Sequence, residues 1–335
     1  MIVDVAVLGA GAWGTALATV LARSQPRVWL HAYRADHART LERERENRRL
    51  LPGVTLSPAI AVTNDYQAAL ANAATVLLVV PTQTLRQTLE QAGPSLRRDA
   101  VLVSACKGIE TESRMLVHQI IADVLGADLL ERTVHLSGPS FAGEVARQTP
   151  TNLVAASADA RLAQAVQLLV STDWLRVYTS DDPIGVEVGG ALKNVMAIAA
   201  GACAGLGLGY NAQAALITRG LAEMTRLTLA LGGQAQTLAG LSGLGDLILS
   251  CTFAQSRNRE LGVQVGRGVP LAEAFEALGG VAEGYSTAKA VHAIAVESGV
   301  DLPICEEVYQ VLHAAKPVQT AVADLLARPL KKEWT

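Results

Sequence analysis

The chain has 335 residues, with 28 Lys and Arg against 31 Asp and Glu, so its formal net charge is −3. Half of the residues are hydrophobic, which is too many for a disordered protein and enough to bury a sizeable core. The near-neutral charge provides no large positive field, so we expect no nucleic-acid partner and no anionic-membrane partner. The length allows two domains of roughly 100–200 residues each.

Cysteine usage and the first residues favour a cytoplasmic protein. The four cysteines, at positions 106, 203, 251 and 305, have no metal-ligand or Cys-x-x-Cys spacing, so we interpret them as reduced thiols and expect no metal. The chain does not open with the basic segment of a signal peptide. Residues 195–210 form the longest apolar stretch and are rich in Gly and Ala, so we expect a buried helix there and no stable membrane insertion.

Short β-branched runs alternate with helical patterns in the first half of the chain. This alternation predicts an α/β domain with a mostly parallel sheet and helices on both faces. The runs are continuously apolar, as strands are when both faces are covered. Strands are expected at residues 3–8, 28–32, 60–63, 76–80, 101–105, 134–137, 153–156 and 175–179, and helices at 12–23, 36–49, 85–91, 113–125 and 160–170.

The pattern changes after about Asp181, where helical spacing with Gly-rich breaks replaces the strands. Helices are expected at residues 184–204, 212–231, 256–266, 271–277, 286–298 and 306–314. We therefore expect an α/β domain over residues 1–182 and an all-helical domain over residues 183–335.

A glycine-rich loop, Gly9-Ala10-Gly11-Ala12-Trp13-Gly14, follows the first predicted strand and opens the first predicted helix. Gly9 suits a tight turn, Gly11 lets a pyrophosphate approach the backbone, and Gly14 permits close packing of the helix. The free N–H groups at the helix start would face the phosphates. This context predicts a Rossmann-like dinucleotide site, the alternative being glycines that merely end a strand.

The second predicted strand ends in Tyr33-Arg34. NAD-selective sites usually carry Asp or Glu about 20 residues after the loop, whereas a guanidinium suits the 2′-phosphate of NADP(H). Asp36 is nearby, and we interpret it as the N-cap of the next helix. The sequence therefore favours NADP(H), leaves NAD(H) open, and also allows Arg34 to be a solvated surface charge.

Reactive side chains occur in three segments of the second half. Lys193 lies on an apolar predicted helix, where burial would lower its pKa and suit acid–base chemistry, although it could also extend to the surface. Asp246 would either cap a helix or face a cation. Ser256, Arg257 and Asn258 at a helix start form either a phosphate site or an ordinary polar helix start.

Two segments of the first half follow predicted strands, at the edge where open α/β sheets bind ligands. Lys107 could contact a substrate carbonyl or phosphate. Ser140, close after Gly138, could instead cap a helix. We interpret Cys106 and His135 as packing residues.

Seven motifs spread along the chain carry a family resemblance. They are GAGAWGTALA from Gly9, SACKGIE from Ser104, LSGPSFAGEVA from Leu136, GVEVGGALKNVMAIAAG from Gly185, NAQAALITRGLAEM from Asn211, LSGLGDLILSCTFAQSRNRELG from Leu241 and VAEGYSTAKAV from Val281. Together they resemble the bacterial-type NAD(P)-dependent glycerol-3-phosphate dehydrogenases. The resemblance implies a cytoplasmic oxidoreductase that interconverts dihydroxyacetone phosphate and sn-glycerol 3-phosphate and supplies glycerol 3-phosphate for phospholipid synthesis.

The resemblance also implies residue roles, with Lys193 as the proton acceptor. Substrate contacts are implied for Lys107, Gly138, Ser140, Lys193, Asp246, Ser256, Arg257 and Asn258. Cofactor contacts are implied for Ala12, Trp13, Tyr33, Arg34, Lys107, Ala142, Arg257, Val281 and Glu283, beside Gly9, Gly11 and Gly14 of the loop. The chain departs from the family at Ala12, where many relatives carry Ser, and the pair Tyr33-Arg34 is variable in the family.

Two other functions are alternatives. A β-hydroxy acid dehydrogenase of similar architecture would carry Lys and Asn one helical turn apart, whereas Asn194 is adjacent to Lys193 and position 197 is Ala. A nucleotide-sensing module without turnover would need the glycine loop, but not Lys193, Asp246 and Arg257 together. The expected partner is a small-molecule substrate, and a homodimer is left open.

Overall fold

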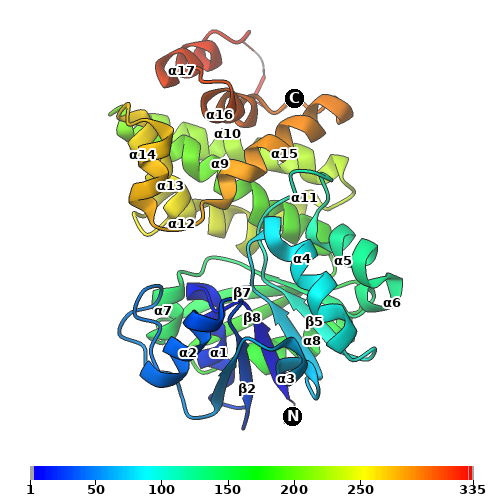
Figure 1. Cartoon of the computed structure of the whole chain (residues 1–335). Coiled ribbons are helices and arrows are strands. Elements are labelled where there is room, and N and C mark those ends of the chain that lie inside the picture. The colour runs from blue at the N-terminus through cyan, green and yellow to red at the C-terminus, as the bar shows by residue number, and fades with distance from the viewer. Residues whose placement is uncertain (1–3, 331, 334–335) are drawn as a thin grey trace.

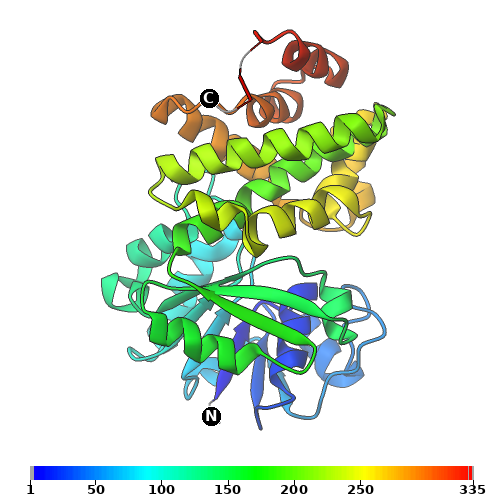
Figure 2. The same ribbon diagram turned by 180° about the vertical axis from the view of Figure 1, so that it is seen from behind.

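Eight strands form one sheet in the order β3-β2-β1-β4-β5-β6-β7-β8 in the computed structural model, which describes residues 4–330 and 332–333. All neighbouring strands are parallel except β6 and β7, which are antiparallel, so the predicted mostly parallel sheet is confirmed. Figure 2 shows the last two strands, drawn in green, at the near edge of the sheet. The strands are β1 (Val5–Leu8), β2 (Val28–His31), β3 (Ile60–Thr63), β4 (Thr75–Leu78), β5 (Val101–Ser104), β6 (Thr133–Ser137), β7 (Thr151–Ala156) and β8 (Leu175–Ser180).

Helices cover both faces of this sheet, because successive strand residues point to opposite faces and are apolar on both. Val7 and Leu30 belong to a core that includes residues of α1 and α8, while Leu8 and Leu78 belong to a second core with residues of α4 and α5. The helices of this part are α1 (Ala12–Leu21), α2 (Ala35–Glu44), α3 (Tyr66–Leu70), α4 (Thr82–Ala92), α5 (Val117–Leu125), α6 (Ala127–Leu130), α7 (Ala142–Ala146) and α8 (Ala160–Val170), with a 3₁₀ turn η1 (Gly93–Ser95).

The strand order reverses between β1 and β4. The chain runs from β1 to β2 and β3 on one side and then returns to β4 on the other side of β1. At such a reversal the connections leave the sheet in opposite directions, which opens a crevice at the carboxyl ends of the strands. The glycine loop after β1 lies at that edge of the sheet.

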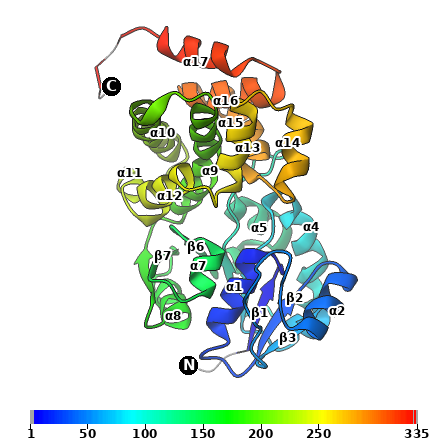
Figure 3. The ribbon, with the colours of Figure 1, turned by 90° about the vertical axis from the view of Figure 1, so that its left-hand side faces the viewer.

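The rest of the chain is helical and lies over one end of the sheet (Figures 1 and 3). Its central helix α9 is flanked by α10, α12, α13 and α15. The elements are α9 (Pro183–Gly205), α10 (Gly209–Ala230), α11 (Ala235–Leu238), a π-helical turn η2 (Leu241–Gly245), α12 (Asp246–Thr252), α13 (Arg257–Gly266), α14 (Leu271–Leu278), α15 (Glu283–Ser298), α16 (Pro303–His313) and α17 (Val318–Leu326).

Packing explains the apolar character of α9. Among the described residues α9 is the one continuous helix long and apolar enough to cross a membrane, yet 78% of its most apolar window is buried inside the protein. Its glycines allow direct backbone contact, since a Cβ on Gly201 would lie 2.0 Å from the carbonyl oxygen of Arg259 on α13. The expected buried helix is therefore present, and the following helix begins at Gly209.

Several sequence predictions differ from the structure in detail. The helix expected at 36–49 ends at Glu44, because Arg45 adopts a left-handed backbone conformation. The helix expected at 113–125 begins at Val117. The short helices α3, α6 and α11, and also α17, were not predicted, whereas helix starts were expected close to the observed starts of α7 and α12. Val3, part of the first expected strand, lies outside the described residues.

Candidate active site

Two lysines converge on one buried carboxylate between the sheet and the helical layer. Lys107 Nζ donates to Asp246 Oδ2 at 2.6 Å, and Lys193 Nζ donates to Asp246 Oδ1 at 2.7 Å. The side chains of Lys107 and Lys193 are 17% and 11% exposed, and that of Asp246 is 1% exposed. Lys107 follows β5, Lys193 lies on α9 and Asp246 begins α12, so the cluster joins the sheet to two helices of the other half.

Burial and charge together set the protonation of this cluster. Burial lowers the pKa of Lys193 to about 8, while Asp246 opposes that shift and the charge of Lys107 adds to it. Burial alone would raise the pKa of Asp246, but the charges of Lys107 and Lys193 outweigh it and hold this pKa below its usual value. Lys193 can therefore exchange a proton near neutral pH while Asp246 stays ionised.

The local structure decides between the alternatives left open for these residues. Lys193 does not extend to the surface, because its neighbours Leu192 and Val195 lie in the helical core and its head group is bonded inside. Asp246 is not the cap of α12, since η2 ends at Gly245 and Gly245 holds the N-cap position. The carboxylate faces two cations instead.

Ser250 is a member of the cluster that sequence reasoning missed. Its hydroxyl accepts a hydrogen bond from Lys193 Nζ at 2.9 Å, and its Oγ lies 3.4 Å from Asp246 Oδ1. Ser250 follows Asp246 by four residues on α12, and residues so spaced share one helix face. That spacing was the signal available in the sequence.

The loop after β6 contributes a second contact to Lys107. Gly138 has φ +128°, a conformation that favours glycine, and its carbonyl oxygen accepts from Lys107 Nζ at 3.3 Å. The Ser140 hydroxyl donates to the same carbonyl at 3.1 Å. Ser140 does not cap α7, whose N-cap position is Phe141. The two predicted substrate contacts on this loop therefore lie beside the lysine cluster.

The start of α13 holds three predicted substrate contacts in different environments. Ser256 is the N-cap, and its side chain accepts from the backbone N–H of Arg259 at 3.3 Å. Arg257 is exposed, and no ion pair to its guanidinium is found among the described residues. Gly280 lies beside it, since a Cβ there would meet Arg257 at 2.6 Å.

Asn258 is already bonded inside the protein. Its Nδ2 donates to Asn194 Oδ1 and its Oδ1 accepts from the backbone N–H of Gly284, both at 2.9 Å. Asn194 in turn donates to the carbonyl oxygen of Lys107 at 3.2 Å. Asn258 thus links α13 and α15 to the lysine cluster, and Asn194 has a positioning contact that the sequence did not indicate.

The glycine loop has the form expected of a dinucleotide loop. Gly9 has φ +116°, and a Cβ there would lie 2.3 Å from the carbonyl oxygen of Val79, just beyond β4. A Cβ on Gly14 would lie 1.8 Å from the carbonyl oxygen of Gly9, so α1 packs directly on the loop. Around Gly11, by contrast, a Cβ would have no neighbour within 4 Å.

The other predicted cofactor contacts of the sheet half lie near this loop or beyond β2. Trp13 and Ala142 pack in one small cluster, in which α1 meets α7. Tyr33 and Arg34 are exposed, and the Arg34 Nε donates to Asp36 at 3.0 Å. Asp36 lies within the first turn of α2 and pairs with Arg34, so its predicted role as N-cap is wrong.

Glu283 connects the two halves of the chain. The backbone N–H of Thr82, at the start of α4, donates to Glu283 Oε1 at 3.1 Å. Burial raises the pKa of Glu283 to about 7, and Thr82 and Arg257 oppose the shift. Val281, the neighbouring predicted contact, is half exposed.

Interpreting His135 as a packing residue is incomplete. Its Nδ1 lies 3.3 Å from Oε1 of the buried Glu187, and the His118 ring contacts the other carboxylate oxygen. This cluster joins β6, α5 and α9, a long-range contact that no local pattern indicates. Cys106 is partly buried, and this burial raises its thiol pKa to about 12, in keeping with its interpretation as packing.

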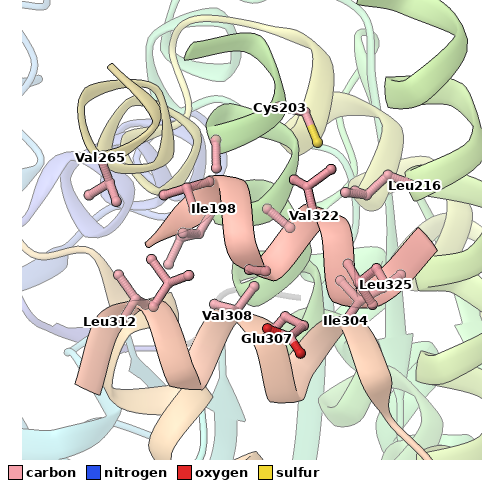
Figure 4. A pocket seen from close by; sticks show the side chains of 15 residues that line it. Ile198, Cys203, Leu216, Val265, Ile304, Glu307, Val308, Leu312, Val322 and Leu325 are labelled. Atoms are coloured by element: carbon pink, nitrogen blue, oxygen red, sulfur yellow. The ribbon is translucent and has the colours of Figure 1, made fainter. Parts of the chain in front are cut away.

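A cavity lies elsewhere, among α9, α10, α16 and α17, and is almost entirely apolar (Figure 4). Ile198, Leu216 and Leu325 line it, and Glu307 is the charged residue at its wall. None of the predicted site residues lines it. Within residues 4–330 and 332–333, no group of three or more His, Cys, Asp or Glu residues could hold a metal ion.

Comparison with known proteins identifies the family. The model of the NAD-dependent glycerol-3-phosphate dehydrogenase N-terminus matches residues 4–163, and that of the C-terminus matches residues 182–323. A glycerol-3-phosphate dehydrogenase (NAD(P)+) of Geobacter sulfurreducens is 49% identical over 329 residues, which are 98% of each chain. The chain belongs to the glycerol-3-phosphate dehydrogenase family. The family resemblance seen in the sequence motifs is thereby confirmed.

Other members of the family agree in sequence and in structure. The glycerol-3-phosphate dehydrogenase (NAD(P)+) of Moorella thermoacetica is 47% identical over 330 residues, covering 98% of this chain and 97% of that one. The crystal structure of glycerol-3-phosphate dehydrogenase from Coxiella burnetii has a TM-score of 0.93 at 39% identity, covering 97% of this chain and 99% of that one. D-mandelate dehydrogenase, at 15% identity and a TM-score of 0.61, shares the fold alone.

Proposed function

We propose that this chain interconverts dihydroxyacetone phosphate and sn-glycerol 3-phosphate with NAD(P)H. The buried cluster of Lys107, Asp246 and Lys193 carries the proposal. In it the exchangeable proton of Lys193 is held by the charged Asp246 and Lys107, at the same edge of the sheet as the glycine loop. The family membership and the names of the relatives support the same reaction. The product, glycerol 3-phosphate, then serves phospholipid synthesis.

The loop after β1 fits the pyrophosphate of a dinucleotide. Gly11 is the N-cap of α1, and no side chain caps the first N–H groups of this helix. Free N–H groups at a helix start bind phosphate well, and the open space at Gly11 admits it. Ala12, Trp13 and Ala142 would border the cofactor, and Val281 and Glu283 would meet it from the helical half. When bound, the nicotinamide cofactor supplies or accepts the hydride.

Arg34 would make NADP(H) the preferred cofactor, with NAD(H) as the second. Its side chain is 71% exposed beyond the carboxyl end of β2, beside the exposed Tyr33, and its carboxylate partner Asp36 is exposed as well. An exposed ion pair contributes little stability, so a 2′-phosphate can replace Asp36 at low cost.

Lys193 would transfer the proton at the carbonyl oxygen. During reduction, its charged form donates a proton to the ketone oxygen; during oxidation, its neutral form takes the proton of the hydroxyl. Lys107 and Asp246 hold the Lys193 ammonium in place, and Lys107 adds positive charge where the oxygen becomes negative.

The substrate phosphate would bind at the start of α13. Arg257 offers a guanidinium, and the first N–H groups of the helix add their partial positive charge. Ser256 and Asn258 shape this helix start through the bonds described above, and Gly138 and Ser140 would border the substrate on the sheet side. Arg257 would also touch the cofactor.

The proposal includes the organisation of the chain. We place the boundary between the NAD(P)-binding domain and the substrate-binding domain at residues 182 and 183, where β8 gives way to α9. We assign the enzyme to the cytoplasm, without membrane insertion, and propose a homodimer. The β-hydroxy acid alternative lacks support, because it needs an Asn one helical turn after Lys193, where position 197 is Ala. Asn194 instead contacts the carbonyl oxygen of Lys107 and the side-chain amide of Asn258. A nucleotide sensor would have no use for the lysine cluster.

One assay tests the reaction directly. NADPH absorbance is followed in the presence of the purified chain before and after dihydroxyacetone phosphate is added. The expected result is substrate-dependent NADPH oxidation, which Lys193→Ala abolishes while NADPH binding is retained. NADPH oxidation with β-keto acids but not with dihydroxyacetone phosphate would favour the alternative dehydrogenase, and NADPH binding without turnover would favour the sensor.

A further inference from the structure

Residues 45–57, which we name the strap, fold into a closed loop between α2 and β3. An antiparallel bridge joins Glu46 to Thr55, and the backbone N–H of Leu51 donates to the carbonyl oxygen of Asn47 at 2.7 Å. Glu46 also accepts from the N–H of Gly53 at 2.8 Å. These bonds give the strap its own fixed shape without a helix or a strand.

Asn47 connects the strap to the glycine loop. Its Nδ2 donates to the carbonyl oxygen of Ala10 at 3.1 Å and to the hydroxyl oxygen of Thr15 at 2.8 Å. Ala10 belongs to the glycine loop, and Thr15 lies in the first turn of α1. Asn47 is only 1% exposed, so water does not compete for these bonds.

The orientation of the Asn47 amide follows from its neighbours. A backbone carbonyl can only accept a hydrogen bond, so the donating Nδ2 must face Ala10. Within the described part of the chain the buried Oδ1 has no hydrogen-bond partner. Leaving a buried acceptor without a hydrogen bond costs folding free energy. Asn47 carries this cost at Oδ1 while its Nδ2 makes two bonds to the glycine loop and the start of α1.

Apolar contacts hold the strap against the same region. Leu51 and Val54 form a small core with Ala16 of α1, and Trp13 and Ala142 pack against that core. Figure 1 shows α7, which begins at Ala142, beside α1. The strap therefore touches three features of the proposed cofactor site: the loop carbonyl, Trp13 and Ala142.

We propose that Asn47 is a positioning residue for the cofactor, an inference that rests on the proposed dinucleotide site at the glycine loop. A phosphate-binding loop must present N–H groups to the anion and keep its carbonyl oxygens away, because a carbonyl oxygen repels phosphate. Asn47 ties the Ala10 carbonyl to the strap and fixes the start of α1 through Thr15. Asn47 thereby keeps the loop in the form that receives the pyrophosphate before the cofactor arrives.

Two substitutions at position 47 and one control test this role. Asn47→Ala removes both donors. Asn47→Asp keeps the shape, directs carboxylate oxygens at the Ala10 carbonyl and adds negative charge near the phosphate site. Leu51→Ala loosens the strap through packing but keeps both Asn47 bonds. The measurements are KM for NADPH, KM for dihydroxyacetone phosphate, kcat at saturating NADPH, and Tm.

The expected result is a rise in KM for NADPH of about tenfold in Asn47→Ala and more in Asn47→Asp. In both variants kcat and KM for dihydroxyacetone phosphate should stay within about twofold of the unchanged enzyme. Leu51→Ala should lower Tm about as much as Asn47→Ala does, but should leave KM for NADPH within about twofold. An unchanged KM for NADPH in Asn47→Ala, or an equal rise in Leu51→Ala, would overturn the inference by making Asn47 purely structural. Gly11→Glu tests the underlying site separately, because undiminished NADPH binding in that variant would place the cofactor elsewhere.

Discussion

Lys193 and Asp246 are 53 residues apart in sequence, yet Nζ of the lysine lies 2.7 Å from Oδ1 of the aspartate inside the protein. Burial favours the neutral lysine, whereas the carboxylate favours the charged one, and the balance leaves the lysine pKa at about 8. A group with such a pKa can both give and take a proton near neutral pH. The pair is therefore suited to a reversible reduction of a ketone.

The two directions of the reaction should depend on pH in opposite ways. Reduction of dihydroxyacetone phosphate should lose rate as pH rises through about 8, because Lys193 must carry the proton that it donates. Oxidation of glycerol 3-phosphate should gain rate over the same range, because neutral Lys193 must accept a proton. The check is kcat/KM measured against pH in both directions.

Lys193→Arg is the control for these profiles. A guanidinium stays charged throughout the accessible pH range, so any activity that remains should lack the transition near pH 8. A transition that persists in Lys193→Arg would assign it to another group.

Asp246→Asn should move the transition of the reduction to lower pH. The carboxylate is the main influence that keeps the proton on Lys193, so its loss lowers the lysine pKa further. At pH 7 the reduction should slow by about 10²-fold or more, because the acid is largely deprotonated and no longer held in place. The measurement is the pH profile of kcat/KM for reduction.

Ser250→Ala provides the comparison for Asp246→Asn. The Ser250 hydroxyl is a neutral acceptor of the same ammonium, so its loss should cost less, about tenfold or under, and shift the transition little. Equal effects of the two substitutions, or an unshifted transition in Asp246→Asn, would mean that charge at position 246 does not control Lys193.

The strands and the glycine loop could be predicted because their signals are local. A run such as Val5–Leu8 is continuously apolar and lies between Asp4 and Gly9, and the loop from Gly9 follows a strand and opens a helix. Periodicity and turn-forming residues act within a few positions, so a single sequence carries them.

The contacts of the site could not be predicted in this way. Lys107 reaches Asp246 across 139 residues, and whether Asp246 capped its helix or bound a cation depended on that distant neighbour. The pattern of residues 36–49 predicted a helix that continued through Asn47. The chain instead leaves the helix at Arg45, and Asn47 finds its partners at Ala10 and Thr15.

Arg34→Glu should reverse the preference between the two cofactors. A carboxylate at this position repels a 2′-phosphate and can accept from the 2′-hydroxyl of NADH. KM for NADPH should rise by about 10- to 100-fold, while KM for NADH should stay level or fall. The ratio of kcat/KM for NADPH and NADH is the measurement.

Arg39→Glu is the matched control for Arg34→Glu. Arg39 lies on the exposed side of α2, and its replacement by Glu changes the net charge by the same amount. A cofactor ratio that stays constant in Arg34→Glu would show that Arg34 does not contact the cofactor. An equal change of the ratio in Arg39→Glu would show that Arg34 acts only through the overall charge.

Arg257→Ala should impair the use of the phosphorylated substrate. Its guanidinium stands at the start of α13, exposed and without an ion-pair partner in the part of the chain that the structure describes, so it is available to an incoming phosphate. A hydrogen bond to a charged group contributes about 1.5–3 kcal/mol, which corresponds to a rise in KM for dihydroxyacetone phosphate of about 10- to 100-fold. Steady-state kinetics at saturating NADPH measure this rise.

Two comparisons separate a phosphate contact from a general loss of activity in Arg257→Ala. Dihydroxyacetone, which has no phosphate, should be reduced by the variant about as slowly as by the unchanged enzyme, because the lost contact was never made. Arg267→Ala, at the other end of the same helix and also exposed, should leave KM for dihydroxyacetone phosphate within about twofold. Equal losses with both substrates would limit Arg257 to cofactor binding or folding, since a phosphate contact acts only on the substrate that carries the phosphate.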